Sequence, residues 1–523
     1  MALQRYMAKI SSSRLLAAQC IMPELNISDY LENADYREKI NMLVEDGIGG
    51  FCIFKATPEQ TARVVTELQS RAAIPLLFSA DFEFGTAMRL EGGTAYPHAM
   101  ALGKGDIATT EEIGRAIADD ARQLGIHWNF APVCDVNSNP KNPIISIRAF
   151  GETPEEVSPH AEAYIRGTQS IGVMACAKHF PGHGDTLEDS HMELPFLNFS
   201  RERFESLEFI PFKKAIAAGV RSVMVAHLAV PELQQGETVP ASLSRNVITN
   251  VLKSDLGFKG LIVTDALDMK AIADNFSSGE AAVRALKAGA DIVLMPVEPG
   301  EALEAVQKAL ESGDLPMDEM KESVEKILTE KEWCGLLKGG KLEYEYHDEN
   351  SSKLGLIAAR KAVKITGNKN LLPLEQFKNI AAFALLCDEE IQPAAQFFQF
   401  LGQVSEQNSD FGFIDDTISE DDLKAFKAGT SEAEIVVFAI FSRVKSYKGC
   451  VGIPEKFHDV ARYLAHGKPS IAIVLGHPYE DNFPAETMIF TYSDSLASIA
   501  AAALVLGGRQ EFDKTEVDIA EKA

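Results

Sequence analysis

Short apolar runs alternate with amphipathic stretches along the first 340 residues or so, and this alternation restricts the folds open to the chain. The apolar runs predict eight strands, at 15–22, 49–54, 75–80, 128–134, 173–178, 222–228, 260–264 and 291–296. Helices are expected between several of them, at 57–72, 109–124, 153–170, 206–218, 244–255 and 278–289. Apolar strands separated by helices indicate a parallel sheet buried on both faces. Eight such units favour a (β/α)8 TIM-type barrel over an open doubly wound sheet.

A second, smaller α/β domain is expected after the barrel. A polar stretch at 339–355 has the composition of a linker. Further apolar runs follow at 379–386, 434–441, 469–475 and 488–492, separated by helical segments such as the alanine-rich one at 494–506. The sequence therefore predicts a catalytic barrel over 1–338, a linker over 339–355 and an α/β sandwich over 356–523.

Charge and cysteine usage argue against several classes of partner. The net charge of −26 disfavours nucleic acid and anionic membranes, because phosphate binding requires a positive field. The seven cysteines are scattered, mostly in apolar runs, which is typical of reduced core residues and not of disulfides or a metal site. No cleavable leader and no run of ~18 apolar residues is recognisable. We therefore expect a cytoplasmic protein.

Polar residues follow the apolar bodies of five predicted strands. Taken by itself, each of these residues could be a helix cap or a solvent-exposed loop residue with no function. Active sites of barrel enzymes gather at the C-terminal ends of the strands, so together these residues predict one polar bowl suited to a hydroxyl-rich ligand such as a sugar. The residues are Asp81, Asp135 with Asn137, Lys178 with His179, His227 and Asp265.

The densest polar cluster is the segment KHFPGHGDTLEDSH at 178–191, directly after the apolar run 173–177. Polar groups at the end of a buried strand cost free energy unless they have partners, so a cluster here indicates a functional site. This segment, with VMVAH at 223–227 and GLIVTDALDM at 260–269, resembles glycoside hydrolase family 3 and, within it, the bacterial β-N-acetylhexosaminidases.

The resemblance covers nearly the whole chain. It includes DFEFG at 81–85 with Arg89, APVCDVNSNPKNPIISIRAFGE at 131–152 and AARKAVKITGNKNLLPL at 358–374, as well as GHPYE and YSDS between 476 and 495. Two departures stand out. Phe84-Gly85-Thr86 replaces the family's frequent Gly-Gly-Arg, and the charged tail QEFDKTEVDIAEKA replaces the usual ending.

Asp265 suits the nucleophile of a retaining glycosidase, which also needs a proton donor near the leaving oxygen. It ends an apolar strand beside Thr264, where an ionised carboxylate can form a glycosyl ester. Asp268, three residues further along the chain, is the alternative nucleophile. If Asp265 has no catalytic role, it would serve as a helix N-cap.

Asp189-Ser190-His191 supplies the proton donor in place of a second Glu. In an extended loop, positions i and i+2 point to the same side, so Asp189 can orient His191 and stabilise its imidazolium form. In the resembling family this pair lies on a mobile loop, and Gly182 and Gly184 would permit such motion. A surface loop with a chance histidine is the alternative.

The resemblance implies hydroxyl and ring contacts from four residues, and pocket lining beside the nucleophile from two. The four are Asp81, Arg148, Lys178 and His179, and the two are Met224 and His227. Asp81 and Lys178 could equally form a buried ion pair. We expect His183 and Asp185 to brace the loop.

Three functions compete. The leading hypothesis is a retaining exo-β-N-acetylglucosaminidase that releases terminal β-linked N-acetylhexosamine from small glycosides or muropeptides, in peptidoglycan recycling, through a glycosyl-Asp265 intermediate. A phosphorylase or β-glucosidase on the same scaffold is the second, since a neutral imidazole repels phosphate less than a carboxylate does.

The third hypothesis is a metal-dependent barrel hydrolase, which would leave Asp265 without a role. Its ligands would be His179, His183, Asp185, Asp189 and His191. Under the leading hypothesis we expect no metal, no cofactor and no nucleic-acid or membrane partner, only a small carbohydrate substrate. The sequence does not determine the oligomeric state.

Overall fold

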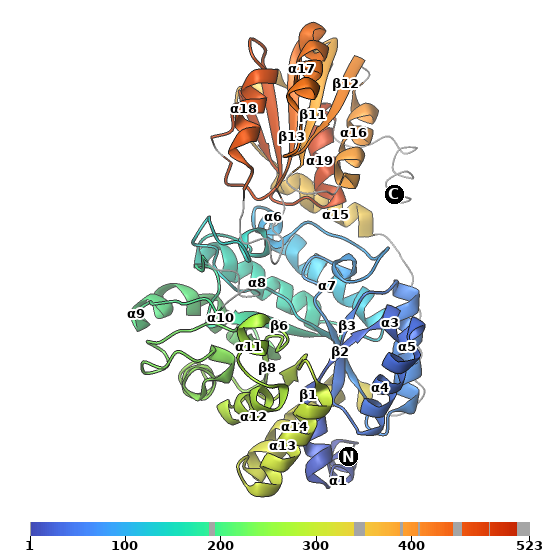
Figure 1. Cartoon of the computed structure of the whole chain (residues 1–523), viewed down its shortest axis with the longest axis vertical. Coiled ribbons are helices and arrows are strands. Elements are labelled where there is room, and N and C mark those ends of the chain that lie inside the picture. Colours follow the sequence, from blue (N-terminus) through green and yellow to red (C-terminus); the bar gives the residue numbers. More distant parts are fainter. Residues whose placement is uncertain are drawn as a thin grey trace. The chain divides into compact units, whose positions relative to one another are not determined.

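The computed structural model describes residues 2–187, 194–338, 351–386, 391–405, 408–442, 452–480 and 482–509. These residues divide into two compact units (Figure 1). The first lies within Met1–Thr94, Thr110–Ile145 and Ala149–Glu349, and the second within Ala95–Thr109, Ser146–Arg148 and Asn350–Ala523. Two short pieces of the N-terminal sequence thus belong to the second unit, which the sequence did not predict. Of the expected linker, 339–350 lie outside the described residues and the rest begins helix α15 (Ser351–Ala362), so the domain boundaries stay a prediction.

The first unit is a barrel of parallel strands, as predicted (Figure 1). Strands β2 to β8 each pair with the next, and β9 closes the ring by pairing with β1 and, through Ile292, with Val263 of β8. Because β1 and β2 are one strand interrupted at Pro23, the ring has eight positions. The strands are β1 (Ile21–Met22), β2 (Glu24–Asn26), β3 (Gly50–Phe54), β4 (Leu77–Ala80), β5 (Trp128–Asn129), β6 (Met174–Phe180), β7 (Ser222–Val225), β8 (Leu261–Thr264) and β9 (Val293–Leu294).

Helices follow most of these strands, largely where the sequence predicts them. Helix α5 shows why: the Thr57 hydroxyl accepts a hydrogen bond from the Gln60 amide, and the Gln60 side-chain oxygen accepts one from the Thr57 amide. Pro58 occupies the first turn. The confirmed helices are α5 (Pro58–Arg71), α7 (Ile107–Gln123), α8 (Pro154–Gln169), α10 (Phe209–Ala217) and α12 (Ser278–Ala288), and α14 (Met317–Trp333) follows later in the chain. Further helices are α1 (Ala2–Lys9), α3 (Ile27–Glu32), α4 (Ala34–Glu45), α9 (Arg201–Arg203), α11 (Lys270–Ala273) and α13 (Pro299–Ser312).

Two sequence predictions are wrong in detail. Most of the predicted strand 15–22 is helix α2 (Ser13–Gln19), capped by the Ser12 hydroxyl, because a short apolar run does not by itself distinguish a buried helix from a strand. The helix predicted at 244–255 is present, and the Ile248 amide closes its first turn on the Ser244 carbonyl at 3.0 Å, but the Ser244 side chain does not cap it as a serine at a helix start is expected to. A π-helix runs over Asn246–Asp255 without a side-chain cap, and the Ser244 hydroxyl is buried with no hydrogen-bond partner in the described part of the chain.

Helix α14 contacts residues that precede the strands, at the N-terminal end of the barrel. Asp291, just before β9, accepts hydrogen bonds from the Ser323 hydroxyl (2.7 Å) and from Lys326 Nζ (3.2 Å). Lys331 Nζ donates to Gln19 Oε1 at 2.8 Å, and burial lowers the pKa of this lysine to about 7. Buried polar groups at this end serve the stability of a barrel, while its chemistry gathers at the other end.

The second unit is an α/β sandwich around a six-stranded sheet of order β10-β15-β14-β13-β11-β12. Only β10 runs antiparallel to its neighbour. Alternate residues of β11 enter two cores: Ala382 packs with α16 and α19, and Phe383 with α18. The strands are β10 (Lys364–Gly367), β11 (Asn379–Leu386), β12 (Asn408–Ile414), β13 (Ile435–Ser442), β14 (Ser470–Gly476) and β15 (Thr487–Phe490), and the helices named here are α16 (Gln392–Val404), α18 (Glu455–Leu464) and α19 (Leu496–Leu506).

The sequence predicted the four central strands of this sheet and missed β10 and β12. These two lie at the sheet edges, where one side of the strand has no partner strand and a continuous apolar run is not required.

The described residues also bear on the cysteine and membrane predictions. Cys20, Cys52, Cys134, Cys176 and Cys334 are free and buried, as expected for reduced core residues. In the described ranges, no helix combines the length and the apolar character needed to cross a bilayer.

Candidate active site

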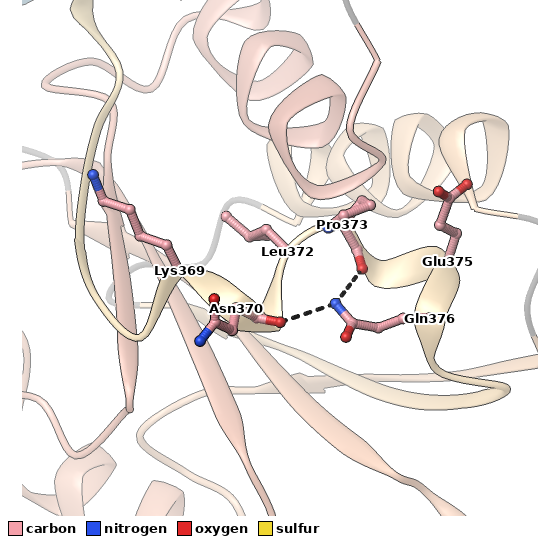
Figure 2. Close-up of a pocket in the computed structure, with 6 residues that line it drawn as sticks. All are labelled: Lys369, Asn370, Leu372, Pro373, Glu375 and Gln376. Atoms are coloured by element: carbon pink, nitrogen blue, oxygen red, sulfur yellow. Dashed lines mark hydrogen bonds between the residues drawn. The ribbon is translucent and has the colours of Figure 1, made fainter.

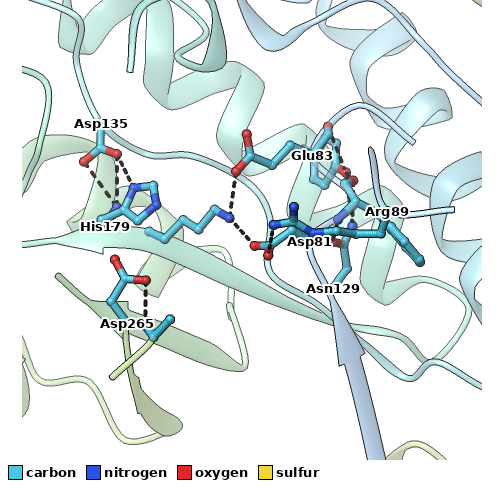
Figure 3. A network of polar contacts seen from close by, with 11 residues as sticks. Asp81, Glu83, Arg89, Asn129, Asp135, His179 and Asp265 are labelled. Atoms are coloured by element: carbon cyan, nitrogen blue, oxygen red, sulfur yellow. Dashed lines mark hydrogen bonds and ion pairs between the residues drawn. The ribbon is translucent and has the colours of Figure 1, made fainter. Parts of the chain in front are cut away.

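The C-terminal ends of the barrel strands bring charged side chains together (Figure 3). Asp81 directly follows β4, Lys178 and His179 lie near the end of β6, and Asp265 directly follows β8. Asp135 follows β5, where neighbouring Val133 bridges to Lys178. Residues from separate parts of the sequence thus meet on one rim because parallel strands end at the same side of the barrel.

Lys178 is the centre of a buried ion network. Its Nζ lies 2.8 Å from Asp81 Oδ1 and 2.7 Å from Glu83 Oε1, and its side chain is only 2% exposed. Arg89 contacts the other oxygen of Asp81 at 2.5 Å. Burial alone would raise the pKa of Asp81, but Lys178 and Arg89 outweigh it and hold that pKa well below its usual range. The ion-pair alternative for Asp81 and Lys178 is therefore confirmed, and their contact with a sugar stays a prediction.

Asn129, the last residue of β5, fixes the backbone next to Asp81. Its Oδ1 accepts a hydrogen bond from the Phe82 amide at 3.0 Å, and its Nδ2 donates to the Phe82 carbonyl at 3.2 Å. The Tyr164 hydroxyl donates to the same carbonyl at 3.0 Å. Sequence analysis missed Asn129 and Glu83. The available signal was their position, since Asn129 ends a strand and Glu83 stands two residues after Asp81.

Asp135 binds two of the three histidines of the polar segment. Its Oδ2 lies 2.7 Å from His179 Nδ1, and its Oδ1 accepts the His183 amide at 2.7 Å. The His179 amide also points to both oxygens, at 3.2 and 3.1 Å. Burial would raise the pKa of Asp135, but the interactions with His179 and His183 lower it. The carboxylate is therefore ionised inside the protein.

Asp265, the predicted nucleophile, is held by a hydrogen bond to β7 and by one from the next residue in the chain. The Asp265 amide donates to the Val225 carbonyl at 2.9 Å, and the Ala266 amide donates to Asp265 Oδ1 at 2.9 Å. His227 Nε2 lies 2.9 Å from the Ala266 carbonyl, so this nitrogen carries a proton, and Nδ1 lies 2.7 Å from the Ser242 hydroxyl. His227 thus orders the chain beside the nucleophile.

Other predicted residues are placed as follows. Met224 lies in β7 and is 2% exposed. Asp268 is exposed. Asp189 and His191 lie outside the described residues, so the acid/base pair stays a prediction.

The start of the polar loop is braced by side chains, as the sequence predicted for His183 and Asp185. His183 Nδ1 lies 2.9 Å from the Thr186 hydroxyl, and burial lowers the pKa of His183 to about 4. Asp185 pairs with Arg203 at 3.1 Å. Gly184 is required for close approach, because a Cβ there would lie 1.7 Å from the Val136 carbonyl oxygen.

Arg148 belongs to the second unit. It ends a 3₁₀ turn, Ser146–Arg148, whose Ile147 packs in the core of that unit. The Ser146 hydroxyl lies 2.7 Å from His477 Nδ1, and burial lowers the pKa of His477 to about 4, so that imidazole is neutral at pH 7. Sequence alone did not reveal this assignment, and the predicted sugar contact of Arg148 stays a prediction.

The described residues hold no group of three or more His, Cys, Asp or Glu side chains arranged to bind a metal ion. Two ligands of the metal alternative, Asp189 and His191, lie outside those residues, so that alternative stays untested.

A pocket of about 550 Å³ lies in the second unit (Figure 2). Gln376 Nε2 donates to the carbonyls of Asn370 (3.1 Å) and Pro373 (2.9 Å), so the polar groups close a turn of the chain. None of the lining residues belongs to the predicted site. They are Lys369, Asn370, Leu372, Pro373, Glu375 and Gln376.

Replacing Lys178 by Met should destabilise the first unit, because it removes the cation shared by Asp81 and Glu83. We expect the free energy of unfolding to fall by about 3 kcal/mol at pH 7. The lowered pKa of Asp81 stabilises the fold above about pH 4, and this contribution is lost as pH falls through the folded pKa. The gap between variant and wild type should therefore narrow below about pH 4.

Both tryptophans, Trp128 and Trp333, lie in the first unit, so urea unfolding followed by their fluorescence measures this effect. Lys326→Met, at the opposite end of the barrel, is the control, since Lys326 is 32% exposed and pairs with one carboxylate. A loss below about 1 kcal/mol for Lys178→Met would contradict the network's contribution.

Comparison with known proteins agrees with this architecture. The model of the glycosyl hydrolase family 3 N-terminal domain matches residues 16–330. The β-hexosaminidase A of Pseudoalteromonas piscicida is 37% identical over 275 residues, which are 48% of this chain and 46% of that protein. The β-N-acetylglucosaminidase/β-glucosidase of Cellulomonas fimi is 32% identical over 306 residues, which are 56% of this chain and 54% of that protein.

The chain thus spans about half the length of these two relatives. A solved glycoside hydrolase family 3 β-N-acetylglucosaminidase from Paenibacillus sp. str. FPU-7 is similar over a longer range. The TM-score is 0.82 at 31% identity, over 95% of this chain and 97% of that one. The family model matches more than half of the residues of this chain, and the chain therefore belongs to glycosyl hydrolase family 3.

Proposed function

We propose that the protein is a retaining exo-β-N-acetylglucosaminidase. The observation that carries this proposal is the rim, where the Asp265 carboxylate follows β8 on the barrel end that also holds Asp81, Lys178 and His179 (Figure 3). The names of the relatives and the similarity to the Paenibacillus enzyme over almost the entire chain support N-acetylhexosamine as the sugar. The substrates would be small glycosides or muropeptides, in cytoplasmic peptidoglycan recycling.

The reaction would proceed in two displacements. An Asp265 oxygen attacks the anomeric carbon, the bond from that carbon to the aglycone oxygen breaks, and the aglycone oxygen takes a proton from His191. A water molecule then attacks the same carbon, gives its proton to His191 and releases Asp265. The Ala266 amide donates to Asp265 Oδ1 at 2.9 Å, which supports a fixed position of the attacking carboxylate.

The acid/base role falls to Asp189 and His191 in this proposal. A carboxylate two residues from the imidazole orients the ring and stabilises its charged form, as an aspartate does for histidine in serine proteases. Neighbouring Asp185 and His183 support the role, since their contacts to Arg203 and Thr186 hold the start of the same segment in place.

Sugar recognition would use the charged groups of the rim. Ionised Asp81 would accept hydrogen bonds from sugar hydroxyls. Lys178 would donate a hydrogen bond to the sugar, and it would lose little conformational entropy because two carboxylates already hold its side chain. His179 and Arg148 would contact hydroxyls or the ring. Met224 and His227 would line or order the wall next to Asp265.

One assay separates this function from the alternatives. We expect turnover of an aryl β-N-acetylglucosaminide well above that of the matched β-glucoside, with free sugar as the product whether or not phosphate is present. The double name of the Cellulomonas relative makes β-glucosidase activity the second candidate. Preference for the glucoside would establish it, and sugar 1-phosphate as the main product at millimolar phosphate would overturn hydrolysis.

Asp265→Asn should lower kcat/KM at least about a thousandfold, or about 4 kcal/mol of transition-state stabilisation, because the amide is a poor nucleophile. Sugar binding and the thermal midpoint should change little, because the backbone contacts of residue 265 remain. Asp268→Asn is the matched control, three residues away and exposed. Activity of Asp265→Asn within tenfold of wild type, or a larger loss in the control, would rule the assignment out.

His191→Ala should lower kcat/KM far more for glycosides with poor leaving groups than for those with good ones, since a good leaving group departs without a proton. Asp189→Asn should give the same pattern more mildly, because the imidazole remains and loses only its partner. The test is a plot of kcat/KM against leaving-group pKa for aryl β-N-acetylglucosaminides. Equal losses along the series would argue against acid catalysis by His191.

A further inference from the structure

Among the described residues of this site, Asp135 is a carboxylate that points to a histidine ring and to backbone amides at once. Its side chain is fully buried, and it sits in the segment after β5, away from Asp81 and Asp265 in sequence. It meets the ring and amide of His179 and the amide of His183. Figure 3 shows Asp135 against the His179 ring. None of the roles assigned above to nucleophile, acid or sugar contact uses it.

The hydrogen-bond chemistry fixes the state of the His179 ring. An ionised carboxylate only accepts hydrogen bonds, so the 2.7 Å contact requires that His179 Nδ1 carry a proton. In the neutral ring, Nε2 is then the nitrogen that accepts a hydrogen bond, as from a sugar hydroxyl. The backbone contacts place the chain, whereas the contact to Nδ1 sets the tautomer and the angle of the ring.

We propose that Asp135 is a positioning residue for sugar binding, which holds the His179 imidazole protonated at Nδ1 and turned to one fixed orientation. This inference rests on the proposed function, in which His179 touches the sugar. Asp135 itself touches no substrate and acts through His179.

The isosteric change Asp135→Asn tests the idea, because both oxygens of the native carboxylate accept from N–H donors. Either orientation of the amide sets its NH2 group against a donor. Turning that group toward the ring favours the opposite tautomer, with the proton on Nε2. The shape of residue 135 is kept, while the negative charge that holds the proton on Nδ1 is removed.

A double-mutant cycle distinguishes positioning from a merely structural role. We expect Asp135→Asn to lower kcat/KM for an aryl β-N-acetylglucosaminide about 10- to 100-fold, the size expected for a hydrogen bond to a charged group. In a His179→Ala background the same change should cost less than about threefold. Losses that multiply in the double variant, or a single variant within threefold of wild type, would overturn the inference.

Asp291→Asn is the matched control. Asp291 is equally buried and also accepts a backbone amide, from Ile262 at 2.9 Å, but it lies at the N-terminal end of the barrel. Its replacement should lower the urea midpoint while kcat/KM stays within about twofold of wild type. A kinetic loss equal to that of Asp135→Asn would mean that any buried carboxylate has this effect, and would overturn the positioning role.

A measurement on the unmodified protein covers the case in which Asp135→Asn does not fold. Ring ¹⁵N chemical shifts of histidine-labelled protein, with His179 assigned from the spectrum of His179→Ala, should show Nδ1 protonated. A neutral ring with the proton on Nε2 would overturn the inference. Absence of wild-type turnover would instead refute the proposed function, and the ring spectrum would still decide the Asp135–His179 interaction.

Discussion

The contact of Lys178 with two buried carboxylates is the interaction on which the rest of the rim depends. Asp81 and Glu83 lie in a loop that Asn129 fixes at Phe82, and Lys178 lies near the end of β6, in a different part of the sequence. Buried charges are tolerated only when they are paired, so the ion network fixes the loop and strand relative to each other. It also leaves Asp81 ionised, which is the form that can accept sugar hydroxyls.

Both ends of the barrel contain buried charges, with different partners. At the N-terminal end, Asp291 and Lys331 are bound to side chains of α14 or to Gln19, groups that hold secondary-structure elements together. At the C-terminal end, the partners of Asp135 are the ring and amide of His179, near the end of β6, and the amide of His183, just after it. Paired buried charges therefore stabilise the fold at the N-terminal end, and at the C-terminal end they orient residues that are candidates for sugar contact.

The second unit contains short pieces of the N-terminal sequence. The turn Ser146–Arg148 is held there by Ile147 in an apolar core and by Ser146 against His477. The turn that ends at Arg148 is therefore held by a side chain 331 positions away from Ser146 in the sequence.

The sequence by itself determined the barrel, the four central strands of the sandwich and the rim positions of Asp81, Lys178 and Asp265, because apolar strands followed by polar residues are local patterns. Only the tertiary structure decided the partners: Glu83 for Lys178 and Asp135 for His179. It also decided what local patterns left ambiguous, such as the helix over most of 15–22 and the edge strands β10 and β12. The physical reason is that pairing of buried polar groups depends on distances between segments remote in sequence, which no local pattern encodes.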